Sequence, residues 1–118
     1  MLPAAHRMRS SEDFRKVRRR GKKFLAPGVV VHISEGFSGA GVSKVGITVG
    51  KDCGNSVARH RLSRRIRGAM SALVSQLPVG TGVVIRALPQ ATEGVDLRES
   101  LMQVIDQLQH RSAANVNS

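Results

Sequence analysis

The stretch KVGITVGKDCGNSVARHRLSRRIRGAM, residues 44–70, decides how the rest of this 118-residue chain is interpreted. Its first part, residues 44–50, alternates β-branched side chains with the period of two that is typical of a strand facing a core on one side. Its second part has apolar residues at helical spacing from Asn55 or Ser56 to about Leu77. The stretch therefore predicts a strand that leads through a short turn into an amphipathic helix.

The polar face of this predicted helix is crowded with like charge. Five arginines and one histidine lie within nine residues, from Arg59 to Arg67. With Leu62 at zero, the apolar side chains fall between roughly −20° and +80° and the cations between roughly 140° and 300°. Asp52 is the only acidic residue between positions 36 and 92, so no acidic partner at helical spacing relieves the repulsion. The arginines also lie near the positive end of the helix dipole, where each cation is disfavoured by about 0.3–1 kcal/mol.

A face that destabilises its own helix favours binding of a polyanion over a merely solvated charged surface. The net charge of the chain agrees, because 19 Lys and Arg stand against 8 Asp and Glu, a formal net charge of +11. Residues 1–67 contain 16 of these basic and 4 of these acidic side chains, whereas residues 68–118 contain 3 and 4. The candidate partners are nucleic acid and an anionic membrane.

Length and composition predict one globular domain. A chain of 118 residues with 41% hydrophobic side chains can bury one modest core. We expect a single domain over residues 1–110 and a disordered tail over 111–118.

Cysteine usage and hydropathy predict a soluble, cytoplasmic protein. Cys53 is the only cysteine, which excludes an intrachain disulfide and fits a reducing compartment, and we interpret it as a structural or incidental thiol. No apolar run approaches the roughly 18 residues of a membrane span, and the start MLPAAHRMRSSEDF lacks the apolar segment of a signal peptide. We expect the lone His6 and His110 to be surface residues, because no metal-ligand spacing accompanies them.

The remaining elements follow from periodicity, caps and breakers. We expect helices over 10–20 and 96–110, with Asp96 as the N-cap of the second, and further strands over 22–26, 28–35 and 82–88. The glycine-rich segment at 36–43 is interpreted as a flexible hairpin loop, because it lacks a phosphate-loop motif. The order αβββαβα predicts an α+β fold, a two-layer sandwich of one four-stranded sheet with helices packed on it.

The residue types on the basic surface indicate phosphate as the ligand. Arginine meets phosphate oxygens with a planar fork of donors, and free backbone N–H groups near Asn55 to Ala58 add an anion site with Lys51 just before it. Only three phenylalanines and no tyrosine or tryptophan are present, so a platform for stacking bases cannot be built. Recognition of RNA by its shape and backbone fits best.

Three stretches together resemble a known family. GNSVARHRLSRRIRGAM, preceded by VGITVGKDC, is similar to the most characteristic segment of the bacterial ribonuclease P protein subunit. LPAAHRMRSSEDFRKVRRRG resembles the opening of that family and VVIRALP its last strand, so the resemblance covers roughly residues 2–108. It implies an αβββαβα fold with an unusual left-handed βαβ crossover through the second helix.

The resemblance also implies a function. Proteins of this family bind the catalytic RNA of ribonuclease P and the 5′ leader of precursor tRNA, and they assist endonucleolytic removal of the leader. The RNA with Mg²⁺ cuts the phosphodiester bond, so the resemblance implies no catalytic side chain in the protein and Mg²⁺ that is bound mainly by the RNA subunit. We assign no metal ligand in the protein and predict no membrane and no obligate protein partner.

Residue roles are transferred by position. The resemblance, with the helix-end argument for the first two, implies that RNA is bound by Lys51, Asn55, Arg59, His60, Arg61, Arg64, Arg65 and Arg67. It implies a leader-binding cleft formed by the first helix and the sheet face, with Phe14, Arg15, Arg18 and His32.

The chain departs from the family pattern at several of these positions. His60 stands where Asn is commonest, and Ser63 replaces a frequent Lys. Arg18 and His32 replace frequent aromatic residues, so phosphate contact is expected to take the place of base stacking on the leader. Asp52 replaces a basic residue beside Lys51 and weakens the positive charge there.

Three other functions are compatible with a small basic domain. A ribosomal or other structural RNA-binding protein shares the charge and the fold class. An autonomous nuclease predicts cleavage by the protein alone. Binding to an anionic membrane requires a basic helix with an exposed apolar face, and the apolar face here is expected to pack in the core.

Overall fold

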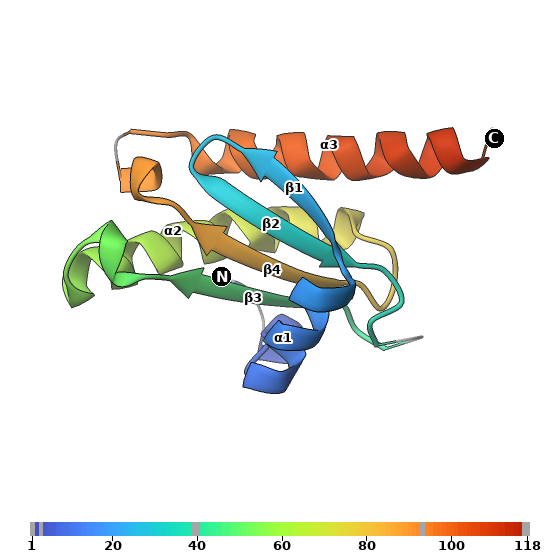
Figure 1. Ribbon diagram of the computed structural model, residues 1–118, viewed down its shortest axis with the longest axis horizontal. Coiled ribbons are helices and arrows are strands. Elements are labelled where there is room, and N and C mark those ends of the chain that lie inside the picture. Colours follow the sequence, from blue (N-terminus) through green and yellow to red (C-terminus); the bar gives the residue numbers. More distant parts are fainter. Residues whose placement is uncertain (1, 3, 39–40, 93, 117–118) are drawn as a thin grey trace.

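The computed structural model describes the backbone of residues 2, 4–38, 41–92 and 94–116, and the side chains of these residues up to His110. Within this part the main elements are α1 (Ser11–Arg20), β1 (Lys22–Ala26), β2 (Val29–Ser34), β3 (Lys44–Val49), α2 (Ser56–Leu73), β4 (Gly82–Ala87) and α3 (Leu97–Val116). Their order confirms the predicted αβββαβα arrangement (Figure 1).

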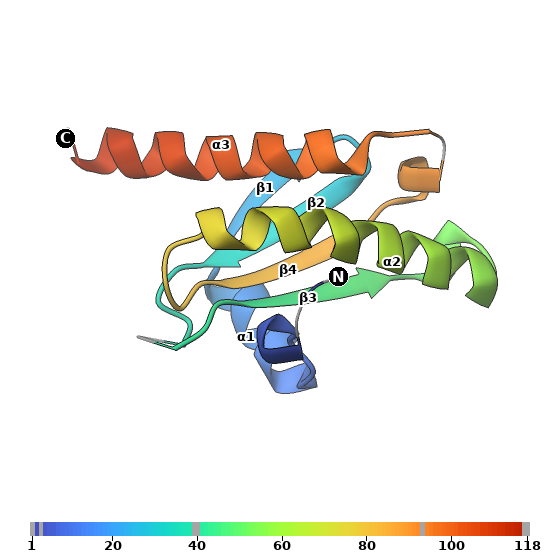
Figure 2. The same ribbon diagram turned by 180° about the vertical axis from the view of Figure 1, so that it is seen from behind.

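The four strands form one mixed sheet in the order β1-β2-β4-β3. The pairs β1–β2 and β2–β4 are antiparallel, whereas β3 and β4 are parallel, with Val45 opposite Val83 and Ile47 opposite Ile85. Because β3 and β4 are parallel neighbours, the chain between them must cross the sheet, and α2 forms that crossover (Figure 2). Its left-handedness stays a prediction from the resemblance.

Helices cover both faces of the sheet. Figures 1 and 2 show α2 and α3 together on one face and α1 on the other. The large core lies on the α2 and α3 side, and a smaller cluster of Met8, Val17 and Val84 lies on the α1 side. The four-stranded sheet with packed helices is confirmed, but the description as two layers omitted the separate position of α1.

Alternation along the strands explains which side chains form the large core. Val29, Val31 and Ile33 of β2 are buried toward α2 and α3, while the residues between them point to the α1 side. The helices contribute the apolar side chains that were expected from their spacing. These are Leu62, Ile66, Met70 and Leu73 of α2 and Leu97, Leu101, Val104, Ile105 and Leu108 of α3.

Two glycines let α1 and the loop after β2 lie close to the other face of the sheet. A Cβ at Gly46 would lie 2.5 Å from Cζ of Phe14, and one at Gly82 would lie 2.7 Å from Cγ of Phe37 and 2.8 Å from Cγ2 of Val17. Real Cβ atoms do not approach other atoms so closely. The absence of a side chain at these two positions therefore lets Phe14, Val17 and Phe37 lie close to the backbone of β3 and β4.

The segment before α1 packs along the free edge of β3. Leu2 is buried in the large core, and the backbone N–H of Met8 donates to the Val45 carbonyl at 2.9 Å. Nδ1 of His6 lies 2.8 Å from the Ser43 carbonyl oxygen, and His6 is half-buried. His6 was expected at the surface; it is partly exposed there and partly covered, because the N-terminal segment pairs with the sheet edge.

The helix ends differ in part from the expected ends. Oδ1 of Asp96 accepts from the Glu99 N–H at 3.1 Å, which confirms the predicted N-cap of α3. Helix α2 ends at Leu73 and continues as a 3₁₀ turn over Val74–Gln76, four residues short of the expected end at Leu77. The residue before Pro78 is disfavoured in helical conformation, so the last turn tightens early.

The helix α3 extends to Val116, beyond the expected end near residue 110. The predicted disordered tail over 111–118 lies outside the residues whose side chains are described, and positions 117–118 lie outside the described backbone as well.

Substitution of Gly46 by alanine is expected to destabilise the protein. The added methyl group would overlap the Phe14 ring and force α1 away from the sheet, which we expect to lower the free energy of unfolding by about 1–3 kcal/mol. Urea unfolding followed by circular dichroism measures this. Gly68→Ala is the matched control: a Cβ there meets nothing within 4 Å, so a gain of about 0.5–1 kcal/mol is expected. Equal stability of the two variants would contradict the close packing of α1.

Candidate nucleic-acid interface

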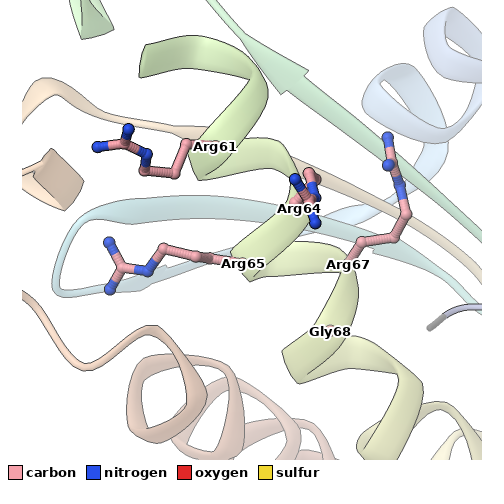
Figure 3. A pocket seen from close by; sticks show the side chains of 5 residues that line it. All are labelled: Arg61, Arg64, Arg65, Arg67 and Gly68. Atoms are coloured by element: carbon pink, nitrogen blue, oxygen red, sulfur yellow. The ribbon is translucent and has the colours of Figure 1, made fainter. Parts of the chain in front are cut away.

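The helix α2 presents most of its cations to solvent. We call His60, Arg61, Arg64, Arg65 and Arg67 the arginine face. All but Arg67 are exposed, and the four arginines line a hollow of about 490 Å³ together with Gly68. Figure 3 shows Arg61 and Arg65 extending in the same direction, Arg64 beside the helix and Arg67 on the other side. The guanidinium groups of the arginine face therefore extend to both sides of the helix and do not form a single row.

No carboxylate neutralises these arginines among the described side chains, where the single ion pair within 4.0 Å joins His110 and Asp106 on α3. Their polar contacts are with neutral groups. Arg67 Nη2 donates to Ser63 Oγ at 3.1 Å, and Arg65 Nη2 donates to the Val95 carbonyl at 3.3 Å. These contacts orient the guanidinium groups and leave their charge available to an external anion.

The N-terminal end of α2 is more closed than the sequence suggested. Oδ1 of Asn55 caps the helix by accepting from the Ala58 N–H at 2.9 Å, so one of the expected free N–H groups is already paired. Lys51 is exposed in the preceding 3₁₀ turn. Arg59 is half-buried, and its Nε atom is buried with no hydrogen-bond partner in the described structure. Arg59 and His60 line a hollow of about 330 Å³ beside Val49 of β3.

The thiol of Cys53 is structural, as expected. The side chain is 4% exposed, and Sγ donates to the Ala87 carbonyl at 3.6 Å. Burial raises the pKa of the Cys53 thiol, and the neighbouring Asp52 raises this pKa further. A protonated, buried thiol is a poor nucleophile, so Cys53 helps to hold the turn before α2 against β4.

Three of the four residues expected in the leader-binding cleft lie together. Phe14, Arg15 and Arg18 of α1 line a hollow of about 420 Å³ with Ser11 and Thr48. Phe14 sits there because Gly46 leaves room for its ring against β3. This hollow combines one aromatic edge with two arginines, which suits a single strand of nucleic acid with its phosphates.

His32 does not line that hollow but lies nearby, on the same face of the sheet. It stands opposite Lys23 of β1 and next to the end of α1, and its Nδ1 atom is buried with no described partner. Burial lowers the pKa of His32, and the charges of Lys23 and Arg18 lower this pKa further. His32, Lys23 and Arg18 thus form a cluster without an acidic member in the described structure, in which the two cations disfavour protonation of His32.

The two basic regions meet at the edge of β3. A hollow of about 170 Å³ there is lined by Arg7 and Arg9 from the segment before α1, by Phe14 of α1 and by Arg67 of α2, with Leu2, Met8, Val45 and Ile47 beneath. The segment before α1 therefore connects the arginine face with the hollow at Phe14, Arg15 and Arg18. Positive charge thus continues around the sheet edge from α2 to α1.

Sequence reasoning missed several residues of this surface. Thr48 lies on the side of β3 that faces α1 and lines the hollow there. Strand periodicity in the sequence could have predicted this position. The role of Lys23 required the β1–β2 register, and that of Arg7 and Arg9 required the pairing of the N-terminal segment. No local sequence pattern predicts the position of Lys23 or the positions of Arg7 and Arg9.

The described side chains do not offer a metal site of the usual kind. No group of three or more His, Cys, Asp or Glu residues lies together among them. The described helices also include none that is long and apolar enough to cross a bilayer. The large apolar residues Leu62, Ile66, Met70 and Leu73 of α2 are buried and Val57 alone of its large apolar side chains is exposed, so α2 lacks the continuous exposed apolar face that binding to an anionic membrane requires.

The fold and the unneutralised arginines define a small basic α+β protein with a surface suited to a polyanion. A family model for ribonuclease P matches residues 2–110. The ribonuclease P protein component of Corynebacterium diphtheriae is 37% identical over 118 residues, covering 94% of this chain and 99% of the relative. That of Mycolicibacterium vanbaalenii is 38% identical over 117 residues, covering 97% and 98%. The chain belongs to the ribonuclease P protein family.

Solved structures share the fold. The ribonuclease P protein of Staphylococcus aureus superimposes with a TM-score of 0.76 at 23% identity, covering 88% of this chain and 95% of that one. The protein of Thermotoga maritima superimposes with a TM-score of 0.73 at 25% identity, covering 86% and 96%. The α+β arrangement of this chain is therefore that of bacterial ribonuclease P proteins.

The lowered pKa of His32 predicts a pH dependence of stability. At pH values above the ordinary pKa of 6.5, His32 is neutral in the folded and the unfolded chain and does not change the free energy of unfolding. Below 6.5 the unfolded chain takes up the proton first, so the free energy of unfolding falls as pH decreases. We expect the free energy of unfolding of His32→Gln to decrease less than that of the wild type between about pH 7.5 and 5.5. Urea unfolding at several pH values in this range measures the difference.

His110→Gln, at an exposed position of α3, is the matched control for that experiment. An identical pH dependence of the wild-type and His32→Gln proteins would exclude His32 as the cause.

Proposed function

We propose that this protein binds the catalytic RNA of ribonuclease P with the arginine face of α2 and the 5′ leader of precursor tRNA with the cleft at α1. In this way it assists removal of the leader to give the mature tRNA 5′ end. The observation that supports the proposal most strongly is the arginine face, whose described members have no acidic partner. An array of phosphates supplies the missing counter-charge, and RNA presents such an array in fixed geometry.

The arrangement of the guanidinium groups supports contact with a folded RNA. Arg61 and Arg65 point to one side of α2, and Arg67 points to the other (Figure 3). Phosphates from two strands or two turns of a helix can thus be bound at once, each by a bidentate arginine. Such contacts position the protein on the RNA and read its shape rather than its base sequence.

The position of the cleft supports a role for it in binding the leader. The hollow with Phe14, Arg15 and Arg18 is connected to Arg67 by Arg7 and Arg9 at the β3 edge. A single strand that leaves the RNA bound on α2 would meet positive charge along this path. Arg15 and Arg18 would contact its phosphates, and Phe14 would offer one ring for stacking.

We assign no catalytic residue to the protein. In the proposed enzyme, Mg²⁺ supplies the cleavage chemistry and is bound mainly by the RNA. The protein acts in the cytoplasm by neutralising phosphate charge and by aligning the precursor with the RNA.

Reconstitution with the cognate ribonuclease P RNA tests this function. At low Mg²⁺ concentration, where charge neutralisation limits the RNA, we expect added protein to restore cleavage of the leader. No effect of the protein would contradict the proposal and would favour a ribosomal or other structural RNA-binding role. Cleavage by the protein without RNA would instead indicate an autonomous nuclease.

Substitution of Arg64 by alanine is expected to weaken binding of the RNA subunit. Loss of one phosphate contact reduces the slope of log K against log salt concentration by about one unit. Filter binding at several salt concentrations measures both quantities. Arg64→Lys is the matched control: it keeps the charge and hence the slope, but loses affinity because the planar fork is gone. An unchanged slope in Arg64→Ala would show that Arg64 contacts no phosphate.

A further inference from the structure

A second hollow lies between α2 and the start of α3, next to the arginine face. Its volume is about 560 Å³. It is lined by Arg65, Gly68, Ala69 and Ala72 of α2 and by Gly94, Val95, Asp96, Leu97 and Arg98 at the beginning of α3. None of the residues contributed by the start of α3 belongs to the motif that resembles the family pattern.

One stripe of α2 leads into this hollow. Taking Arg61 as zero, Arg65, Gly68 and Ala72 lie between roughly −20° and +40° around the helix axis. The stripe therefore begins with two arginines that extend in the same direction and continues with two residues that have almost no side chain (Figure 3). A ligand bound by Arg61 and Arg65 can extend along the helix without contacting a large side chain.

Two arginines from different elements line the hollow. Arg65 is oriented by its hydrogen bond to the Val95 carbonyl, which uses one of its N–H groups and leaves the others available. Arg98 is exposed in the first turn of α3, where a cation is disfavoured by the helix dipole. No ion pair involves either arginine in the described structure. An anion between them would neutralise the charge of both arginines and accept hydrogen bonds from both.

Gly68 keeps the floor of the hollow open. A Cβ at this position would meet nothing within 4 Å, so packing within the protein does not require glycine. Glycine inside a helix nevertheless costs up to about 1 kcal/mol relative to alanine. A glycine that the fold does not need, exposed among arginines, fits a ligand that approaches the helix backbone closely.

Asp96 narrows the class of ligand. Its Oδ1 accepts the Glu99 N–H as the N-cap of α3, and the carboxylate stands in the same hollow as the two arginines. A free phosphate would be repelled by this carboxylate, whereas a ribose-phosphate unit can place its phosphate at the arginines and donate its 2′-hydroxyl to the acceptor.

We propose that this hollow is an additional RNA-backbone site, in which Arg65 and Arg98 bind one phosphate over the open floor at Gly68. The site rests on the proposed function, because it extends the RNA surface of α2 onto α3. It makes the start of α3, in the nearly neutral part of the chain, a contributor to RNA binding.

A double-mutant cycle tests whether the two arginines share one phosphate. We expect Arg98→Ala to weaken binding of the ribonuclease P RNA up to about fivefold and to reduce the salt slope by about one unit. Because the ligand is shared, Arg65→Ala and Arg98→Ala together should lose less affinity than the sum of the single losses. The matched control pairs Arg98→Ala with Arg64→Ala, which belongs to the arginine face but does not line this hollow, so additive losses are expected. Additive losses for Arg65 and Arg98, or no effect of Arg98→Ala, would overturn the site.

The outcomes separate this site from the proposed function. If the wild-type protein does not bind the RNA, the proposed function fails. If Arg64→Ala weakens binding and Arg98→Ala does not, only the additional site is wrong.

Substitutions at Gly68 provide a second test that does not depend on charge. Gly68→Ala and Gly68→Gln should both fold at least as stably as the wild type, because the position is open. The glutamine fills the floor and should reduce RNA affinity, while the alanine, which differs by one methyl group, should bind nearly as the wild type does. Equal affinity of the two variants would show that no ligand approaches this part of α2.

Discussion

The structure depends on how α2 is held in place, because one face of this helix is buried while the cations on its other face repel one another. Arg61, Arg64 and Arg65 lie on the exposed side with no acidic partner in the described structure. Burial of Ile66 and Met70 against the sheet provides the opposing free energy, about 1.5–3 kcal/mol for each large apolar side chain. The large core therefore offsets the cost of a cationic surface that is useful only when an anion binds.

The other parts of the fold extend this surface around the sheet. The crossover between the parallel strands β3 and β4 places α2 on one face, and Gly46 lets α1 pack closely on the other. The N-terminal segment runs along the edge of β3 and places Arg7 and Arg9 between the two helices. The positive charge of this small protein thus extends from α2 on one face of the sheet, around the edge of β3, to α1 on the other face.

Much of the fold was predicted from the sequence because the signals are local. Strand alternation and helical spacing depend on residues a few positions apart, and the cap formed by Asp96 depends on a residue three positions away. The end of α2 was placed four residues late because tightening before Pro78 competes with an apolar pattern that continues to Leu77. The position of α1 on the opposite face was missed, since its short apolar stripe does not specify which surface it covers.

For the candidate site, the sequence by itself determined the arginines of α2, the lack of acidic residues near them and the family to which the chain is similar. Only the tertiary structure decided that Arg67 turns toward Arg7 and Arg9, that Arg59 is half-buried, and that Arg98 shares a hollow with Arg65. The physical reason is that composition and periodicity are properties of neighbouring residues, whereas these arrangements arise from strand pairing and helix packing between distant segments.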